Sequence, residues 1–490
     1  MTGSEVLHRA LVKHAKQQGQ QTSIIEAITG KKITYYRLLS SVLSLQNFLG
    51  IKSRQTIILA TSGGIINSII WLTSLIFGHF LIPISPNTTE SEYNELLEKY
   101  TPDILITETE EWMTEPKTKQ LSLSDIQKII SRKKTFPKEM PHIADGTIFL
   151  QSSGSTGTPK GMILNATQIV ITAKNICKRH KLTNTDKGLT PLPFYHVNAP
   201  VVSLITSMLV GSIVIIAPKF SASNFWAWVK KYDPTWISIV PTILAILLKS
   251  DKPSFLKRSS LRFFRTASAP LPKANLRRFE KKFGFPVIET YGISEGASTI
   301  FSNPLPPRKH IPGSVGLALE VDAKIVNIKT GRREKTGKTG EIYIKGEQII
   351  KHYEDGRDKD SFVNGWFRTG DLGYMDKAGY LFITGRKKDI IIRGGENIMP
   401  REIEEILLMY PEVIEATVLG KKDDILGEKV VAFLVSDKKD DLFVKELKEF
   451  AASQLSPQKV PAELYLLDEL PRGKTNKIDK NILREFYPSK

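Results

Sequence analysis

Short apolar runs alternate with amphipathic helical patterns over residues 1–380. Runs rich in β-branched residues predict strands over 55–60, 103–107, 147–151, 235–240 and 286–289. Between them, apolar residues at helical spacing predict helices, for example over 33–49, 90–99 and 272–283. Strands that alternate with helices form a parallel sheet covered by helices. The pattern therefore predicts an α/β fold for most of the chain.

Two stretches, 61–86 and 199–218, contain no Asp, Glu, Lys or Arg and exceed the roughly 18 apolar residues that indicate a membrane span. Each is interrupted by a glycine, Gly78 or Gly211, and then closed by a proline. Glycine ends a helix well because it adopts the left-handed backbone that other residues avoid. We therefore predict a buried helix, a glycine cap and a buried strand in each stretch rather than a membrane span.

The pattern changes in the last third of the chain. Short strands separated by turns are expected from about residue 313 to 385, which predicts a small β subdomain. The expected organisation is a large N-terminal domain of helix-covered sheets over 1–387 and a smaller, mobile α+β C-terminal domain over 388–490. Within the latter, the sequence predicts helices over 400–409 and 440–454, strands over 413–419 and 428–435, and a polar tail.

The composition is that of a globular protein, with 41% hydrophobic and 24% charged residues among 490. The single cysteine, Cys177, excludes an intrachain disulfide and a cysteine metal cluster. The first residues lack the apolar core of a signal peptide, so we expect a cytoplasmic protein. The net charge of +18 makes polyanions candidate partners, namely nucleic acid, a membrane surface or nucleotide-like ligands, although a lysine-rich proteome would also explain it. The basic clusters are short and lack interleaved aromatic residues, which argues against nucleic acid.

The segment 152–161, Ser-Ser-Gly-Ser-Thr-Gly-Thr-Pro-Lys-Gly, lies between two apolar runs. Its glycines permit the close approach of an anion, its hydroxyls can donate to phosphate oxygens, and Lys160 adds positive charge. It is not a Walker A loop, because no lysine follows the second glycine. A Ser/Gly-rich hairpin turn is the alternative, but this density of small polar residues favours phosphate binding.

The same segment resembles the phosphate loop of the adenylate-forming (AMP-binding) enzymes, which include acyl-CoA synthetases, adenylation domains of peptide synthetases, and luciferases. Further motifs of that superfamily follow in the same order over essentially the whole chain. They are Tyr291-Gly292-Ile293-Ser294-Glu295, Thr369-Gly370-Asp371, Gly385-Arg386 and the segment 471–479. Several ordered motifs are far more specific than one. The chain therefore resembles this superfamily, and the segments 302–307 and 312–316 look like those of acyl-CoA synthetases in the oxalate and fatty acid–CoA ligase branch.

The resemblance implies an ATP site and a Mg²⁺ site. It implies that Tyr291 packs along the adenine and that Asp371 accepts from the ribose hydroxyls. Glu295, with the hydroxyl of Thr156, would hold Mg²⁺, a hard cation that prefers oxygen ligands. Without the family, Glu295 would be interpreted as a surface residue and Asp371 as a turn residue. The nucleotide-binding residues implied are Ser153, Gly154, Ser155, Thr156, Gly157, Lys160, Ser268, Ala269, Pro270, Thr290, Tyr291, Gly292, Ser294, Asp371, Arg386 and Lys477.

Three residues are implied to be catalytic. Lys477 would reach the α-phosphate of ATP as negative charge develops there, and Lys474 is the competing candidate. Thr156 belongs to the phosphate loop. His196 would lie near the substrate carboxylate or on the route of the thiol; without the family, a histidine beside aromatic residues would be interpreted as part of the core.

The implied reaction has two steps. A carboxylate attacks the α-phosphorus of MgATP and gives an acyl-adenylate and pyrophosphate; a thiol, that of coenzyme A (CoA), then attacks the acyl carbonyl and releases AMP. Lys388 falls at the domain hinge of the family, so the C-terminal domain would rotate about it between the steps. Gly394 and Gly395 would let the narrow pantetheine arm, and His196 its thiol, come close to the site.

Two alternatives to an acyl-CoA synthetase remain. The first is a stand-alone adenylating enzyme that loads a phosphopantetheine carrier protein, which dependence on free CoA would distinguish. The second is a non-enzymatic binder of nucleotides or nucleic acid on a degenerate version of the fold. The second is disfavoured because Lys160, Glu295, Asp371, Arg386 and Lys477 are all retained. The expected partners are a small carboxylic acid, ATP and CoA, without nucleic acid or a membrane span.

The acid itself is less well defined by the sequence. The resemblance implies an acid pocket lined by 236–241, 268–270 and 289–290. Oxalate ligases carry a histidine three residues after the glutamate of the Mg²⁺ motif, whereas Ser298 stands here, which argues against oxalate. Thr290 replaces the glycine of many long-chain enzymes and indicates a restricted tunnel. We therefore expect a small or medium aliphatic or aryl acid.

Overall fold

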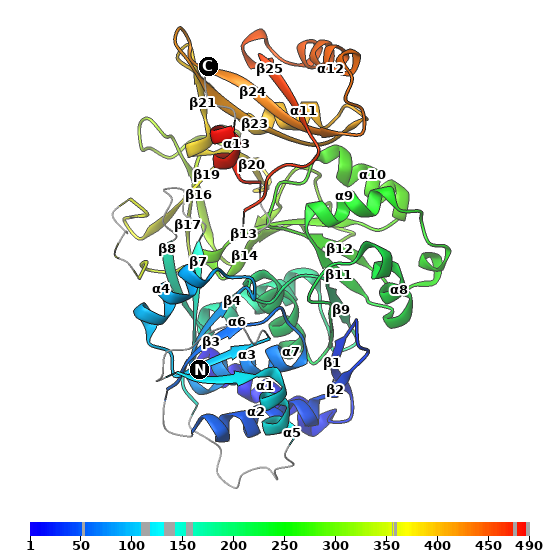
Figure 1. Cartoon of the computed structure of the whole chain (residues 1–490), viewed down its shortest axis with the longest axis vertical. Coiled ribbons are helices and arrows are strands. Elements are labelled where there is room, and N and C mark those ends of the chain that lie inside the picture. The colour runs from blue at the N-terminus through cyan, green and yellow to red at the C-terminus, as the bar shows by residue number, and fades with distance from the viewer. Residues whose placement is uncertain are drawn as a thin grey trace.

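Two sheets of mostly parallel strands build the larger part of the molecule (Figure 1). The computed structural model describes residues 1–50, 54–108, 118–131, 143–152, 160–354, 356, 360–473 and 478–486. The nine-stranded sheet runs in the order β15 (Leu317–Ala318), β14 (Ser298–Ser302), β13 (Val287–Ile293), β12 (Phe263–Thr266), β11 (Trp236–Ile239), β9 (Lys187–Thr190), β10 (Ile213–Ile216), β1 (Thr22–Glu26), β2 (Lys32–Thr34). Its strands from β13 to β1 pair in parallel, as the alternating pattern predicts.

The six-stranded sheet is parallel except for its last pair. Its order is β6 (Lys119–Ser122), β5 (Ile104–Thr107), β3 (Thr56–Ala60), β4 (Phe80–Ile84), β7 (Thr147–Ser152), β8 (Lys160–Asn165), and β7 and β8 form an antiparallel hairpin. The helices of this part of the chain are α1 (Gly3–Gln17), α2 (Tyr35–Leu49), α3 (Ile65–Phe77), α4 (Glu90–Tyr100), α5 (Leu123–Ser131), α6 (Ala166–His180), α7 (Thr206–Val210), α8 (Ala222–Tyr232), α9 (Pro241–Lys249) and α10 (Lys273–Phe283). One continuous hydrophobic core joins the two sheets and their helices.

Both uncharged stretches fold as predicted. In the first, α3 ends at Gly78, which has a left-handed φ of 85°, and β4 follows. In the second, a π-helical turn, η1 (Pro200–Ile205), leads into α7, which ends at Gly211 with a φ of 77° before β10. Most of these side chains are buried in the core. Within the described residues, no helix combines the length and the apolar character that crossing a bilayer requires.

A smaller sheet follows the nine-stranded one along the chain. It contains β16 (Asp322–Val326), β17 (Gly340–Lys345), β18 (Phe362–Val363), β19 (Trp366–Met375) and β20 (Leu381–Arg386), which pair in antiparallel fashion. The short strand β15 lies inside the range expected for this subdomain but pairs with β14 instead. It therefore extends the edge of the nine-stranded sheet.

The C-terminal elements lie together at one end of the molecule (Figure 1). They are β21 (Ile391–Arg393), β22 (Glu396–Ile398), α11 (Pro400–Leu407), β23 (Val413–Asp423), β24 (Gly427–Ser436), α12 (Asp441–Gln454), β25 (Glu463–Leu467) and α13 (Lys480–Phe486). Buried residues between Ile391 and Leu455 form a core of their own. The expectation of a plain polar tail after α12 is wrong, because β25 pairs in parallel with β24 and α13 packs back onto β23. The domain boundary at residue 388 stays a prediction.

Helix α2 begins two residues later than the predicted helix over 33–49. Ile33 and Thr34 instead belong to β2, which pairs with β1. The Thr34 side chain then accepts a hydrogen bond from the backbone N–H of Arg37. A threonine at this position satisfies one of the free N–H groups at a helix start, which explains the boundary.

Candidate functional site

The hairpin of β7 and β8 holds the two ends of the predicted phosphate loop. Its last paired residues are Ser152 and Lys160. The loop residues Ser153, Gly154, Ser155, Thr156 and Gly157 lie outside the described residues, so their proposed contacts stay a prediction. Lys160 is described only in its backbone, as the first residue of β8. The loop therefore begins and ends at adjacent positions on the edge hairpin of the six-stranded sheet.

Contacts from outside the hairpin fix the start of β8. The backbone N–H of Glu354 donates to the carbonyl oxygen of Gly161 at 3.0 Å. The Glu354 carboxylate in turn accepts from Lys99 at 3.2 Å and from the Tyr100 hydroxyl. A Cβ at Gly161 would lie 2.7 Å from the Phe149 ring, so glycine is required for this packing. No sequence motif singled out Glu354 or Tyr100, because the contact joins residues more than 250 positions apart.

Three predicted site residues meet where β13, β19 and β20 come together. The Tyr291 hydroxyl donates to one oxygen of Asp371 at 2.5 Å, and Arg386 Nε lies 3.1 Å from the other. The Asp371 side chain is only 6% exposed, whereas that of Arg386 is 46% exposed. Desolvation and the neighbouring carboxylate raise the pKa of Tyr291 well above its usual value, and Asp371 raises the pKa of Arg386. The hydroxyl therefore keeps its proton and the guanidinium its charge, so both hold the Asp371 carboxylate.

The turn before Asp371 is also held by hydrogen bonds. The Thr369 hydroxyl donates to the carbonyl oxygen of Ile342 at 2.8 Å and accepts from the backbone N–H of Asp371 at 3.1 Å. Gly370 between them has a left-handed φ of 70°. The Thr-Gly-Asp motif thus places its carboxylate through side-chain and backbone contacts together.

Gly292 and Thr290 flank Tyr291 on β13. A Cβ at Gly292 would lie 1.5 Å from the carbonyl oxygen of Ser298, so only glycine allows β13 and β14 to pair this closely. The Thr290 hydroxyl donates to the carbonyl oxygen of Thr266 at 3.0 Å. Ser294 follows at the start of a short 3₁₀ turn, η3 (Ser294–Gly296). These contacts fix the backbone that carries the Tyr291 ring.

Glu295 lies in η3 and is oriented by a residue that sequence reasoning missed. The Tyr353 hydroxyl donates to Glu295 Oε1 at 2.7 Å. The backbone N–H of Ile350 donates to the carbonyl oxygen of Glu295 at 2.8 Å. Oε2 has no hydrogen bond from the described residues. One half-buried carboxylate oxygen therefore remains available, which suits Mg²⁺ held by one carboxylate, substrate phosphates and water.

Two loops lie side by side on the predicted acid side of the site. Ser268, Ala269 and Pro270 follow β12 and are exposed. Ser268 has a left-handed φ of 75°, which is uncommon for a residue other than glycine. The Asn198 side-chain amide donates to the Ser268 hydroxyl at 3.1 Å and thereby joins the loop of His196 to this loop. His196 is half-buried and its ring contacts that of Tyr195.

The remaining predicted residues belong to the C-terminal part of the chain. Lys388 lies in the short 3₁₀ turn η4 (Lys387–Asp389) between β20 and β21. Gly394 and Gly395 form the turn between β21 and β22, with φ values of 56° and 83°. A Cβ at Gly395 would meet nothing within 4 Å, so this turn is open in the present domain arrangement. Lys474 and Lys477 lie outside the described residues.

The base of the loop that carries Lys477 is nevertheless described. Arg472 and Ile478 form a backbone bridge, and Arg472 pairs with Glu415 at 2.6 Å. Beyond the bridge, Lys480 lies 3.8 Å from Asp389 of η4. The base of the loop is therefore fixed to the C-terminal sheet and lies beside the predicted hinge.

A buried carboxylate adjoins the nucleotide strand. Glu289, on β13, is 4% exposed and accepts a hydrogen bond from the Gly313 backbone N–H at 2.8 Å. Burial raises the pKa of Glu289 to about 7. The charges of Arg401 and Glu405 on α11 also act on this carboxylate, and Glu405 lies 3.8 Å from Lys273. Glu289 thus lies at the boundary between the nine-stranded sheet and the C-terminal elements.

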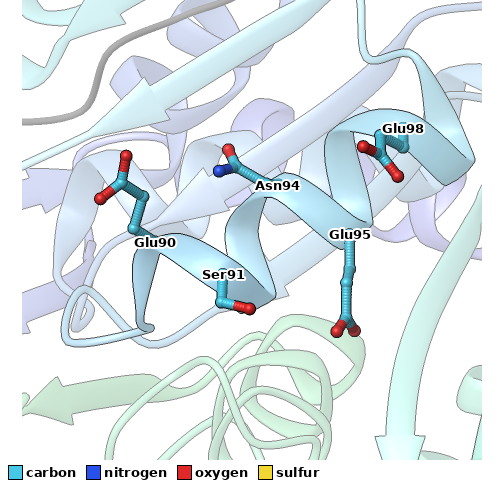
Figure 2. A pocket seen from close by; sticks show the side chains of 5 residues that line it. All are labelled: Glu90, Ser91, Asn94, Glu95 and Glu98. Atoms are coloured by element: carbon cyan, nitrogen blue, oxygen red, sulfur yellow. The ribbon is translucent and has the colours of Figure 1, made fainter.

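A pocket of about 460 Å³ lies elsewhere, along the exposed face of α4 (Figure 2). Its lining residues, Glu90, Ser91, Asn94, Glu95 and Glu98, all come from this helix, and none belongs to the motifs above. Across the described part of the chain, no group of three or more His, Cys, Asp or Glu side chains could hold a metal ion by itself.

Two family models match the chain. The AMP-binding enzyme model matches residues 11–354, and the model of the AMP-binding enzyme C-terminal domain matches residues 402–477. A sulfoacetate–CoA ligase from Cupriavidus necator is 39% identical over 68% of this chain and 65% of its own length. An oxalate–CoA ligase from Arabidopsis thaliana is 36% identical over 71% of this chain and 69% of its own length. The matched region thus spans about two thirds of these relatives.

Other similarities cover nearly the full length. A long-chain-fatty-acid–CoA ligase from Bacillus subtilis is 30% identical over 98% of this chain and 94% of its own length. The crystal structure of ATP-bound MatB from Rhodopseudomonas palustris has a TM-score of 0.88 at 27% identity and covers 99% of both chains. The o-succinylbenzoate CoA synthetase from Bacillus subtilis in complex with ATP and a magnesium ion has a TM-score of 0.82 at 26% identity, over 97% and 99% of the two chains. The predicted α/β architecture is therefore confirmed.

Replacing Glu289 by glutamine tests whether the buried Glu289 carboxyl has a raised pKa. Glutamine keeps an acceptor for the Gly313 N–H but cannot ionise. The pKa of Glu289 is raised from 4.5 to about 7, so this carboxyl contributes stability below pH 4.5 that is lost as the pH rises through 7. We expect Glu289→Gln to raise the free energy of unfolding by on the order of 3 kcal/mol at pH 8. Chemical denaturation at pH 8 and pH 5 measures the difference, which should shrink at pH 5; equal differences at both values would contradict the assignment.

Proposed function

Because the chain belongs to the family of AMP-binding enzymes, we propose that it is an acid–thiol ligase that activates a carboxylic acid with ATP and transfers the acyl group to coenzyme A. The family membership confirms the resemblance drawn from the motifs. The relatives named above are CoA ligases. The observation that carries the proposal is the meeting of Tyr291, on β13, with Asp371 and Arg386, which pair across β19 and β20 some 80 positions later in the chain.

The Tyr291–Asp371–Arg386 group is proposed to bind the nucleoside of ATP. One carboxylate oxygen of Asp371 accepts a hydrogen bond from Tyr291, the other forms an ion pair with Arg386, and each retains a lone pair. These lone pairs can accept from the two ribose hydroxyls. The Tyr291 ring would pack along the adenine beside Thr290 and Gly292, and the loop 268–270 would complete this side. Exposed Arg386 is free to turn its remaining donors towards a phosphate.

The phosphate loop and Glu295 are proposed to hold the triphosphate. Ser153 to Gly157 and Lys160 would donate to the phosphate oxygens, and Ser294 would add a hydroxyl beside Glu295. Bound Mg²⁺ would neutralise part of the phosphate charge. Glu295, oriented by Tyr353, and the hydroxyl of Thr156 would supply its protein ligands. The net charge of +18 favours the approach of such an anionic substrate.

Adenylation then requires positioning and charge stabilisation. A carboxylate oxygen of the acid attacks the α-phosphorus, the bond to the bridging oxygen of pyrophosphate breaks, and pyrophosphate leaves. Lys477 would lie near the α-phosphate, where negative charge grows in the transition state. The protein's main contribution is to hold the two reactants in line, as in other phosphoryl-group chemistry.

Thioester formation requires a different set of residues at the same place. Rotation about Lys388 would withdraw Lys477 and bring the turn of Gly394 and Gly395 towards the acyl-adenylate. The thiol sulfur then attacks the acyl carbonyl, the thiol proton is released, and AMP leaves with the electron pair of the broken C–O bond. His196 is proposed to lie along this route. A carrier protein with a phosphopantetheine thiol is the alternative acceptor.

Acid-dependent release of pyrophosphate tests adenylation directly. We expect a panel of carboxylic acids with MgATP to give release that Lys477→Ala reduces by about 100-fold or more, since a charge that acts only in the transition state is lost. Lys474→Ala, a neighbouring lysine on the same loop, is the matched control and should retain most activity. Stimulation by free CoA would support a CoA ligase, and its absence would favour the carrier protein. Equal losses in both variants would contradict the assignment of Lys477.

Nucleotide affinity tests the group around Asp371. We expect Asp371→Ala to raise the KM for ATP by roughly 10- to 100-fold, because two ribose hydroxyls lose a charged acceptor. Tyr291→Phe keeps the ring and removes only the hydrogen bond to Asp371, so its effect should be several-fold smaller. Steady-state kinetics with varied ATP at saturating acid would measure both. A larger loss in Tyr291→Phe than in Asp371→Ala would contradict the proposed roles.

A further inference from the structure

Arg265 is a buried arginine whose side chain has only neutral hydrogen-bond partners. It lies on β12, within the nine-stranded sheet, and is 1% exposed. Its Nη1 donates to Asn198 Oδ1 at 3.1 Å and to the Ser238 hydroxyl at 3.2 Å. Its Nη2 donates to the Thr299 hydroxyl at 2.6 Å. The other residues of β12 are uncharged, so Arg265 is the one charged side chain that this strand buries in the sheet.

The positive charge of Arg265 has no counter-charge in the described part of the chain. No carboxylate there forms an ion pair with it, and its Nε–H is buried without a hydrogen-bond acceptor. Burial lowers the pKa of Arg265 to about 9, so the group remains charged at neutral pH. A buried cation without a partner is costly and is normally paired. The structure therefore contains a buried guanidinium that is held in place by three neutral partners and keeps one N–H group without an acceptor.

Other arginines of the molecule show the usual arrangement. Arg401, also buried, pairs with Glu405 at 3.2 Å. Arg368 pairs with Glu341 at 3.1 Å, and Arg262 pairs with Asp186 at 2.7 Å. Arg179 donates to the carbonyl oxygens of Ser302 and Ala318, which carry partial negative charge. Arg265 differs from all of these because its partners are two hydroxyls and a side-chain amide.

The partners of Arg265 lie in or near the segments expected to line the acid pocket. Ser238 lies within 236–241, and Asn198 follows His196 by two residues. Thr299 adjoins Ser298, the position where a histidine would indicate oxalate, and the two hydroxyls lie 3.5 Å apart. From Arg265, the side chain of Asn198 leads to Ser268 in the exposed loop after β12. A polar path therefore connects the buried guanidinium with the open side of the site.

We propose that the acid activated by this protein carries a second anionic group, a carboxylate or a sulfonate, and that Arg265 binds this group. The inference rests on the proposed function and names its substrate class. A guanidinium matches the geometry of a carboxylate or sulfonate and can donate two parallel hydrogen bonds. The free Nε–H would provide one of them. The other would come from Nη2, which lies on the same edge of the guanidinium as the Nε–H and donates to the Thr299 hydroxyl with only one of its two N–H groups.

The activities of two relatives agree with this chemistry. Sulfoacetate carries a sulfonate beside the carboxylate that forms the thioester, and oxalate carries a second carboxylate. With Ser298 in place of histidine, the second anion of the present substrate would be held mainly by the guanidinium on β12. The expected substrate is thus a short acid with charge at both ends, rather than the unspecified small or medium acid that the sequence suggested.

Matched pairs of acids test the inference in the intact protein. Pyrophosphate release would be measured with malonate, succinate and sulfoacetate, each against a partner of similar size that lacks the second charge: monomethyl malonate, monomethyl succinate and methylsulfonylacetate. For the preferred acid we expect kcat/KM to exceed that of its uncharged partner by at least about 100-fold, because the partner leaves a buried charge unpaired. A ratio near one for every pair would overturn the proposal while leaving acid activation intact.

Arg265→Met assigns the preference to the guanidinium. We expect this variant to lower the ratio towards one, mainly through a higher KM for the dianionic acid, with the KM for ATP changed less than twofold. Loss of an unpaired buried charge should not lower the melting temperature. Arg179→Met, which removes a partly buried arginine that lies elsewhere, is the control and should retain the ratio. A folded Arg265→Met protein with the ratio of the unsubstituted protein would overturn the proposal.

The Arg265→Lys variant and a panel of monoacids provide two further tests. Should Arg265→Met not fold, Arg265→Lys keeps the charge without the planar fork, and we expect it to lower the ratio by about tenfold; an unchanged ratio would count against Arg265. If neither member of any pair releases pyrophosphate while fatty and aryl monoacids do, the substrate class is wrong and the function stands. If no acid of any class releases pyrophosphate, both the function and this inference fail.

Discussion

The carboxylate of Asp371 is the point on which the arrangement of the site depends. Tyr291 comes from the nine-stranded sheet, whereas Asp371 and Arg386 come from two strands of the small sheet. One carboxylate therefore joins the two sheets and fixes the end of β20. The predicted hinge at Lys388 begins two residues after Arg386, so the same contact sets the point from which the C-terminal elements depart. The proposed nucleotide site and domain motion share this single anchor.

Arg265 and Glu289, two buried ionisable residues on neighbouring strands, lie on opposite faces of the nine-stranded sheet. In the parallel pairing of β12 and β13, Arg265 lies opposite Ile288, and Thr266 lies opposite Glu289. Successive side chains of a strand point to opposite faces. Arg265 and Glu289 are therefore on different faces and cannot neutralise each other. Arg265 faces the segment that follows His196, whereas Glu289 faces Gly313 and the side of α11. The two ionisable groups therefore act in different surroundings, Arg265 beside the proposed acid site and Glu289 at the boundary with the C-terminal elements.

Much of the fold follows from local patterns, because strands of β-branched residues and glycine-capped helices are specified by nearby sequence. The two uncharged stretches and the strands over 55–60 and 235–240 are examples. Elements that form only through partners distant in the sequence were not predicted. β25 lies in a segment that is polar overall and forms only because β24 offers it an edge.

The site was predictable to the extent that its residues belong to ordered motifs, as Tyr291 and Asp371 do. Tyr353 and Glu354 belong to none, and their partners, Glu295 and Tyr100, become neighbours only in the folded chain. Arg265 did leave a signal, a charged residue inside the apolar run Phe-Phe-Arg-Thr-Ala. A run of that kind predicts a buried strand, and a buried strand with one arginine predicts a buried anion or its binding site. Whether the anion belongs to the protein or to a ligand depends on tertiary contacts, which the sequence does not specify.

Contacts within the C-terminal elements, and at their boundary with the N-terminal part, indicate how one chain could catalyse two chemical steps. The base of the Lys477 loop is tied to the C-terminal sheet by Arg472 and lies beside the hinge turn through Lys480. Across the boundary with the N-terminal part, the described ion pairs are long and at least partly exposed, with Lys273 3.8 Å from Glu405 and Lys249 3.9 Å from Asp437. Exposed pairs of this kind contribute little stability, about 0–1 kcal/mol each. A rotation about the hinge would break these contacts at small cost. It would carry the Lys477 loop and the Gly394–Gly395 turn together, because both belong to one sheet with its own core.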